Sequence, residues 1–262
     1  MKKILYANGD SLTFGMEILG DYSYLEENKQ SAWPAALARL AGIDQVLNRA
    51  HCGASNEFIH KRTIIDLTNM AAEGQDPRET VVAIGWSSIC RQEIYTRDQV
   101  QRVTGLDLPL GVDFAASSGS YQQWGTIFMN PGFNQWLRSA TGQQVPIFDQ
   151  LRDQFTEYVW NDQMEYEKWA VLQLSLADYL DQRGYSWVMF NAVHAHDDRM
   201  LTPAVRAALN RKGMYRPDWS MLPWVDRFYS ANKRACGHPA SDAHAALARL
   251  LHLHMRQQGL ID

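Results

Sequence analysis

Cysteine is scarce in this chain of 262 residues, which contains only Cys52, Cys90 and Cys236. Their number is odd and they are far apart, so they do not form the framework of paired cysteines that stabilises small secreted proteins. No two of them have the spacing of zinc ligands, and we predict no metal site from them. This pattern fits a reducing compartment, and we therefore expect a cytoplasmic protein.

Long hydrophobic runs are also lacking. The apolar run that follows Lys2 and Lys3 stops at Asn8, which is too short for a signal peptide or a membrane span. Positive charge is not in excess either, since the net charge is −4 and no extended basic patch is present. We therefore expect neither a membrane nor a nucleic acid as the partner, and the sequence leaves the oligomeric state open.

What the chain does contain is the ordinary balance of a globular protein, with 46% hydrophobic and 21% charged residues. Short apolar or β-branched runs alternate with amphipathic segments in the order strand, helix, strand, helix, strand. This order predicts a doubly wound parallel sheet with one sizeable core. The predicted strands are 3–8, 45–50, 80–85 and 186–193, and the predicted helices include 32–41, 56–72, 203–212 and 241–258.

The regular pattern is lost between the third and fourth predicted strands. Residues 89–145 are rich in Gly, Ser, Gln and aromatic side chains and have no clear period. The segment is too long for a plain connection, so we predict an inserted lid or substrate-facing segment. Its aromatic residues either line a pocket or fill the small core of the insertion itself. They include Trp124, Phe128, Phe133 and Trp136. After it, helix-forming residues predict two helices, or one long bent helix, that end at Gly184.

The stretch KILYANGDSLTFG at residues 3–15 contains the clearest candidate for chemistry. A buried parallel strand that ends in Gly9-Asp10-Ser11 runs into a tight turn at the carboxyl edge of the sheet, where open α/β folds place their sites. Such a turn can present Ser11 as a nucleophile, with its own backbone N–H as half of an oxyanion hole. The alternative is a plain turn in which Asp10 and Ser11 only cap the next helix.

Further candidate residues follow the other strands or precede the last helix. Gly53 comes after the second strand, Gly85 and Ser87 come after the third, and His238 stands just before the final helix. A serine nucleophile needs a base near neutral pH, and histidine suits this role. The remaining groups can donate to a developing oxyanion. The chain therefore supplies a nucleophile, two donors and a base.

These blocks, NGDSLTFG, CGASN, GWSS and CGHP followed by His244 and Ala248, resemble the SGNH hydrolases, also called GDSL esterases or lipases. The resemblance implies a flavodoxin-like three-layer α/β/α sandwich with a parallel sheet and a large insertion. It implies a single domain over 1–262, with 89–145 as the inserted segment. It also implies a serine esterase that hydrolyses small acyl esters without a cofactor, with O-acetyl groups on carbohydrate as candidate substrates.

The resemblance assigns Ser11 as the nucleophile and His238 as the base. It places the N–H groups of Ser11 and Gly53 in the oxyanion hole, and we expect the hydroxyl of Ser87 to be the third donor. Four further residues near these blocks are candidate substrate contacts. They are Asp10, Asn56, Trp86 and Arg91. For Arg91, a surface ion pair with Glu93 is the alternative.

The sequence departs from the family pattern at two places. The third block usually reads Gly-x-Asn-Asp, whereas this chain has Gly85-Trp86-Ser87-Ser88, and Asn56 or Asn191 are alternatives for the missing amide donor. The family also has Asp three residues before its His, where this chain has Ala235. We therefore predict that a main-chain carbonyl or a water, and not a carboxylate, holds Nδ1 of His238.

Two other classes of function stay open from the sequence. One is a non-catalytic module that binds a glycan or a protein in the same cleft, which both departures favour. The other is a metal-dependent phosphoesterase that uses His194, His196 and Asp197, although the spacing of these residues is loose. His244 is expected to be structural, on the inner face of the last helix.

Overall fold

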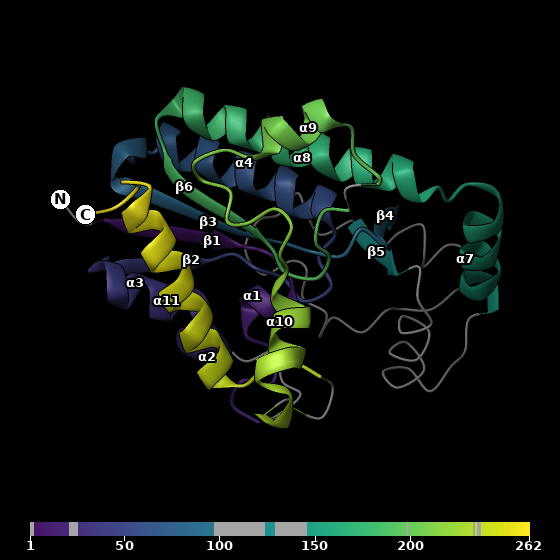
Figure 1. The fold of residues 1–262 in the computed structure, drawn as a ribbon, viewed down its shortest axis with the longest axis horizontal. Coiled ribbons are helices and arrows are strands. Elements are labelled where there is room, and N and C mark those ends of the chain that lie inside the picture. The colour runs from purple at the N-terminus through teal and green to yellow at the C-terminus, as the bar shows by residue number, and fades with distance from the viewer. Residues whose placement is uncertain are drawn as a thin grey trace.

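A four-stranded parallel sheet forms the centre of the computed structural model of this protein (Figure 1). The strands are β1 (Ile4–Asn8), β2 (Gln45–Asn48), β3 (Thr80–Trp86) and β6 (Ser186–Asn191). Their order is β2-β1-β3-β6, and every neighbouring pair is parallel. This is the order of the flavodoxin-like doubly wound fold. The predicted fold class and the four predicted strands are therefore confirmed.

The structure describes residues 3–20, 26–96, 124–128, 146–197, 199–232, 234 and 237–262. For residues 92–96, 124–128, 146–149 and 151–152 it describes the backbone only.

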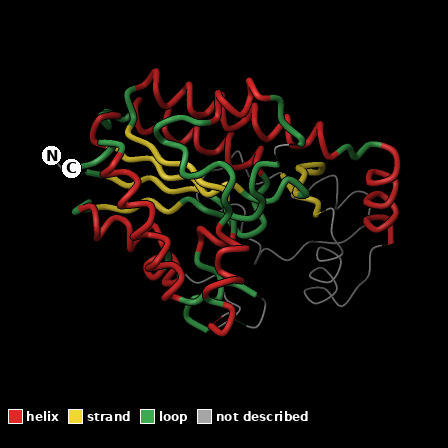
Figure 2. The backbone as a smooth tube through the Cα atoms, in the orientation of Figure 1, coloured by secondary structure: helices red, strands yellow, loops and turns green. Residues whose placement is uncertain are grey.

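Helices cover both faces of the sheet, as Figures 1 and 2 show. The helices α4 (Asn56–Ala72) and α8 (Asp162–Arg183) lie on one face. The helices α3 (Trp33–Ala41) and α11 (Ser241–Gln257) lie on the other. The result is a three-layer α/β/α arrangement.

Alternation along the strands explains how the two cores form. In β3, Val81 and Ala83 point into the core beneath α3 and α11, whereas Val82 and Ile84 point into the core beneath α4 and α8. Successive side chains of a strand face opposite sides of a sheet, so a strand that is apolar on both sides is buried on both. All seven residues of β3 are buried.

The helix boundaries follow local signals in most cases. The Ser55 hydroxyl accepts the N–H of Phe58 at 3.1 Å and caps α4, and Gly184 ends α8 with a left-handed φ of 78°. The sequence offers Ser241 and Asp242 as N-cap residues of the last helix, and this prediction was wrong. Ala240 is the N-cap of α11, and no side chain bonds there.

The structure also contains helices that the sequence pattern did not predict. These are α2 (Glu26–Ser31) and α10 (Met221–Phe228), together with the short 3-10 turns η1 (Pro77–Glu79) and η2 (Ser230–Asn232). The short helix α1 (Ser11–Phe14) follows the turn at Asp10, and Asp10 is its N-cap, as the capping alternative expected. α9 (Pro203–Leu209) is shorter than the predicted 203–212. Elements of one or two turns carry too few residues to show a period of 3.6, so the sequence pattern does not distinguish them from loops. α7 (Pro146–Tyr158) and α8 are separate helices, which settles the choice left open for that region.

The predicted insertion is described only in part. Its strands β4 (Arg91–Thr96) and β5 (Trp124–Phe128) pair antiparallel in a second, two-stranded sheet. The rest of the insertion, including Phe133 and Trp136, lies outside the described residues, so its role as a lid remains a prediction. In the part of the chain that the structure describes, no helix is both long and apolar enough to cross a membrane.

Candidate active site

A close approach between α1 and the sheet sets the position of the site. Thr13 of α1 lies against Gly9 and Gly85, so that a Cβ on Gly85 would come within 2.6 Å of Thr13 Oγ1. A Cβ on Gly9 would overlap Thr13 and lie 2.8 Å from the Gly85 carbonyl oxygen. Only glycine leaves room for the helix at both positions. The two glycines therefore allow α1 to begin directly over the carboxyl ends of β1 and β3.

Ser11 is the first residue of α1, immediately after the end of β1. The side chain is 8% exposed. Within the described ranges, neither its hydroxyl nor its backbone N–H has a hydrogen-bond partner. The first N–H groups of a helix point outward and carry partial positive charge, which suits them to an anion. Ser11 thus combines an uncommitted hydroxyl with an uncommitted donor.

Gly53 follows β2, the strand next to β1, at the same edge of the sheet. It has a left-handed φ of 82°, which favours glycine. Its neighbours are tied to the serine turn, since the N–H of His51 donates to the Gly9 carbonyl oxygen at 3.0 Å. The Ala54 carbonyl oxygen accepts from Arg91, as described below. No acceptor for the Gly53 N–H lies among the residues with described positions, which leaves it available as a second donor.

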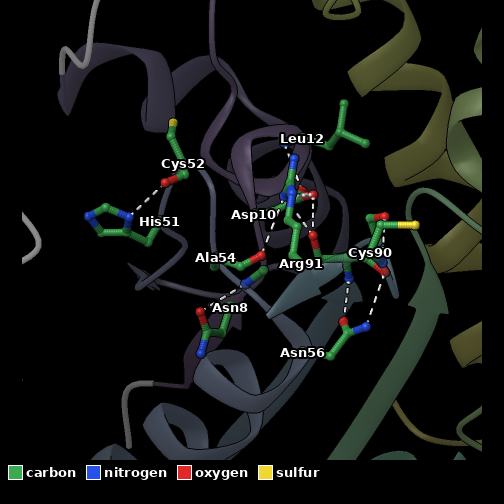
Figure 3. A network of polar contacts seen from close by, with 12 residues as sticks. Asn8, Asp10, Leu12, His51, Cys52, Ala54, Asn56, Cys90 and Arg91 are labelled. Carbon is green, nitrogen blue, oxygen red and sulfur yellow. Dashed lines mark hydrogen bonds and ion pairs between the residues drawn. The ribbon is translucent and has the colours of Figure 1, made fainter. Parts of the chain in front are cut away.

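A polar network surrounds Asp10, the residue that precedes Ser11 in the chain (Figure 3). Nη1 of Arg91 is 2.7 Å from Oδ2 of Asp10 and 2.6 Å from the Ser87 hydroxyl, and it also donates to the Ala54 carbonyl oxygen at 3.3 Å. Oδ1 of Asp10 accepts the N–H of Leu12 at 3.0 Å and so caps α1. Asp10 is fully buried, and the Arg91 side chain is 17% exposed. A buried carboxylate needs such a partner, and this pair ties the turns after β1, β2 and β3 together.

The position of Ser87 corrects its expected role. Its hydroxyl donates to Oδ2 of Asp10 at 2.8 Å and accepts from Arg91, and the residue is fully buried. A hydroxyl has one proton, which here goes to Asp10. Ser87 therefore has no side-chain proton left for an oxyanion in this arrangement, and its role is to support the turn.

The amides suggested as substitutes are also committed. Asn56 binds the backbone of Ser87 from both ends of its amide, accepting from the N–H at 2.8 Å and donating to the carbonyl oxygen at 3.3 Å. Asn191 donates to the Pro217 carbonyl oxygen at 2.8 Å and accepts from Gln173 at 3.1 Å. These amides fix loops at the edge of the sheet instead of facing a substrate.

The four candidate substrate contacts differ in how far they are exposed to solvent. Trp86 is fully buried in the core beneath α4 and α8, so it packs the sheet and cannot contact a ligand at the surface. Asp10 and Asn56 are 0% and 4% exposed and hold the site from within. Arg91 remains the partly exposed member of the four, and its partner is Asp10.

The partner of His238 is the largest difference from expectation. Oε2 of Glu17 lies 2.8 Å from Nδ1 of His238, although the two residues are 221 positions apart. The prediction of a main-chain carbonyl or a water at Nδ1 was therefore wrong. With Glu17 ionised, Nδ1 carries the proton and donates, which leaves the lone pair on Nε2. No hydrogen bond joins Nε2 to Ser11 among the described groups, and such bonds often tighten only when substrate binds.

A second contact holds the His238 loop against the segment that follows α1. Nη2 of Arg234 donates to the Ile18 carbonyl oxygen at 3.0 Å. The loop itself is closed by the N–H of Arg234, which donates to the His238 carbonyl oxygen at 2.9 Å. These contacts hold the His238 loop against residues 17 and 18, which follow the helix that starts at Ser11.

His244 has the structural place that was expected of it. It is fully buried in α11, and its Nδ1 accepts the N–H of Trp33 at 3.2 Å, at the start of α3. Burial lowers the pKa of His244 to about 3. It is therefore neutral near pH 7 and serves as a cap that joins α11 to α3.

His194, His196 and Asp197, the candidate metal ligands, lie in the loop after β6. The side chains of His196 and Asp197 bond to other residues of the protein. His196 stacks on Trp169, with ring centroids 4.4 Å apart, and its Nε2 bonds Gln173 at 2.9 Å. Asp197 pairs with Arg199 at 2.6 Å. Among the residues described, no group of three or more His, Cys, Asp or Glu side chains could hold a metal ion. This part of the chain gives no support to the phosphoesterase hypothesis.

The partners of Arg91 and the role of Glu17 were not predicted from the sequence. For Arg91 the sequence predicts either a surface ion pair with Glu93 or a substrate contact. Neither prediction includes the ion pair with Asp10 that the structure has. Glu17 was missed, although an acid six residues after Ser11 was a usable signal once Ala235 was seen in the expected place of the acid. Sequence spacing carries no information on a contact between loops so far apart.

Residues 16–116 match the model of a family of unknown function, DUF6071. The curated proteins contain no match.

Solved structures resemble the fold at low identity. TesA is 13% identical with a TM-score of 0.46, and the match covers 98% of this chain and 99% of TesA. A catalytic mutant of Axe2, an acetylxylan esterase from Geobacillus stearothermophilus, is 15% identical with a TM-score of 0.47, over 100% and 98% of the two chains. Est2A, an acetyl xylan esterase from Butyrivibrio proteoclasticus, is 12% identical with a TM-score of 0.48, over 99% of this chain and 65% of Est2A.

Proposed function

We propose that this protein is a serine esterase of the SGNH type that hydrolyses small acyl esters. The observation that carries the proposal is the contrast between Ser11 and its surroundings. Asp10, Ser87, Asn56 and Arg91 are all engaged in hydrogen bonds, while the hydroxyl and N–H of Ser11 have no partner in the described structure. The Ser11 oxygen is not one of the enclosed polar atoms that lack a partner, so it is open to solvent. An accessible hydroxyl next to an uncommitted N–H at the carboxyl edge of a sheet favours a site for a ligand.

In the proposed reaction, Nε2 of His238 takes the proton of the Ser11 hydroxyl while Oγ attacks the ester carbonyl carbon. The carbonyl electron pair moves to the oxygen, where the N–H groups of Ser11 and Gly53 donate to it. The intermediate collapses, the C–O bond to the alcohol breaks, and the alcohol leaves with the proton from Nε2. Water then repeats these steps on the acyl-enzyme, which releases a carboxylic acid and regenerates Ser11. Ester and water become acid and alcohol, and no cofactor takes part.

Arg91 contributes the field of a nearby cation in this proposal, and not a third hydrogen bond, since its Nη1 donates to Asp10, Ser87 and the Ala54 carbonyl oxygen. Its guanidinium is anchored to Asp10 and Ser87 beside the serine turn, and it is partly exposed. A fixed cation in a site of low dielectric stabilises developing negative charge without reorganisation. As substrate we propose an O-acetyl group on a carbohydrate, because the motif blocks resemble a family that acts on small acyl groups.

The test is labelling with a fluorophosphonate probe, which reacts with activated serines. We expect one adduct, mapped to Ser11 by peptide mass spectrometry, absent in Ser11→Ala and strongly slowed in His238→Ala. A series of p-nitrophenyl esters from acetate to octanoate should show the highest kcat/KM for the shortest acyl chains. If the folded wild-type protein neither reacts with the probe nor hydrolyses any of these esters, the esterase proposal is wrong.

One observation favours a second candidate, a module that binds a glycan or a protein without cleaving it. The family's third donor is missing, and the hydroxyl in its place is committed to Asp10. Removing one oxyanion donor costs about 10²–10³-fold in kcat in a working enzyme. A folded protein that resists the probe but binds acetylated xylo-oligosaccharides in calorimetry would support this module.

A further inference from the structure

We propose that Glu17 is the acid that positions His238, so that the triad of this protein is Ser11, His238 and Glu17. This inference rests on the proposed esterase function and deepens it. The acid comes from the segment directly after the nucleophile's helix, and not from the segment before the histidine, where the chain has Ala235.

The contact itself has the geometry of an orienting carboxylate. Oε2 of Glu17 is 2.8 Å from Nδ1 of His238, within the range of a charge-assisted hydrogen bond. The Glu17 side chain is 2% exposed, and that of His238 is 18% exposed. A carboxylate with so little access to water interacts strongly with its partner, because water screens the pair only weakly. The histidine keeps an exposed edge for the substrate, while the acid is enclosed.

The backbone of Glu17 supports a functional reading independently of the contact. Its φ is 61°, in the left-handed region that residues with a side chain seldom adopt. Glycine would adopt this conformation freely, as Gly15 does two positions earlier with a φ of 86°. A strained residue that is neither Gly, Asn nor Asp persists where the surroundings or the function require its side chain. Here that side chain is a buried acid on the candidate base.

The chemical consequence concerns the tautomer and the charge of His238. A carboxylate at Nδ1 holds the proton there, so that Nε2 has its lone pair directed to accept the Ser11 proton. During attack the imidazole becomes an imidazolium, and the negative charge of Glu17 stabilises it. A neutral amide at this position would do neither, since its NH₂ group can face Nδ1 and favour the opposite tautomer.

The experiment compares Glu17→Gln with Glu73→Gln, which makes the same change at an exposed position beyond the far end of α4. With p-nitrophenyl acetate, we expect Glu17→Gln to lower kcat on the order of 10⁴-fold with little change in KM, as for loss of the acid in a serine triad. Glu73→Gln should match the wild type. Glu17→Gly provides a second variant that relieves the left-handed conformation, and it should lose the same activity while remaining folded by circular dichroism.

A proton NMR measurement tests the contact without using activity. The wild type should show a strongly downfield Nδ1–H resonance that persists in Ser11→Ala and disappears in Glu17→Gln and His238→Ala. If Ser11→Ala and His238→Ala are inactive while Glu17→Gln and Glu17→Gly keep wild-type kcat, the esterase stands and the role of Glu17 is wrong. If the wild type itself is inert towards both ester and fluorophosphonate, the proposed function fails, and the positioning role fails with it.

Discussion

Asp10 and Arg91 form a buried ion pair, with Oδ2 and Nη1 2.7 Å apart, that joins the serine turn to the first residue of β4. Removing one member of such a pair leaves an uncompensated charge in the interior. We therefore expect Asp10→Asn and Arg91→Met each to lower the free energy of unfolding by about 3–5 kcal/mol.

The double variant Asp10→Asn/Arg91→Met tests whether the two residues act as a pair. It should be less destabilised than the sum of the single variants, because neither charge is then left alone. Urea denaturation at pH 7 measures all three. Additive effects would show that the two charges contribute independently to stability.

Ser87→Ala separates the role expected from the sequence from the role seen in the structure. If Ser87 were an oxyanion donor, its loss would reduce kcat by about 10²–10³-fold. As a member of the Asp10 network, it should instead cost about 1–2 kcal/mol of stability, with kcat falling less than about tenfold. Steady-state kinetics on p-nitrophenyl acetate and urea denaturation of the same preparation give both numbers. A large loss of kcat at unchanged stability would restore the original assignment.

The close packing of Thr13 on Gly85 predicts a compensating pair of substitutions. Gly85→Ala places a Cβ 2.6 Å from Thr13 Oγ1 and should destabilise the protein by about 1–3 kcal/mol. Thr13→Ala removes that oxygen, so the double variant should recover part of the loss. The remaining cost comes from Phe190, whose Cζ would lie 3.0 Å from the new Cβ. Absence of any recovery in thermal denaturation would contradict this account of the glycine.

Buried histidines predict a loss of stability on mild acidification. Burial lowers the pKa of His244 to about 3 and that of His196 to about 4, from the ordinary value of 6.5. Above pH 6.5 both are neutral in either state. As the pH falls below 6.5 the unfolded chain takes up protons that the folded chain does not, and stability falls by about 1.4 kcal/mol per pH unit for each residue.

Urea midpoints between pH 7.5 and 5 measure this dependence. His244→Gln, whose side-chain carbonyl can still accept the Trp33 N–H, should be less stable at pH 7.5 but show a shallower slope below pH 6.5. A wild-type stability that does not change over this window would contradict the burial of neutral histidine.

The sequence by itself determined the sheet and its covering helices. The continuous apolar run of β3, with the β-branched Val81 and Val82, required a strand buried on both faces, and the order of elements required parallel neighbours. The sequence also predicted that Ser11 and Gly53 lie at the same edge of the sheet, because each follows a predicted strand and the carboxyl ends of parallel strands share one edge. These are consequences of local periodicity, which a single sequence displays.

Only the tertiary structure decided which polar groups meet at that edge. The pairing of Glu17 with His238 joins residues 221 positions apart, and nothing in either local pattern specifies it. The same holds for Arg91, which donates to Asp10 across 81 positions in the sequence. Arg91 also donates to the hydroxyl of Ser87, so this hydroxyl is part of the same network. Loops can bring many residues to an edge, and the choice among them depends on burial. A carboxylate enclosed by the fold must find a cation or a donor, and this requirement selected the partners that the motif spacing did not predict.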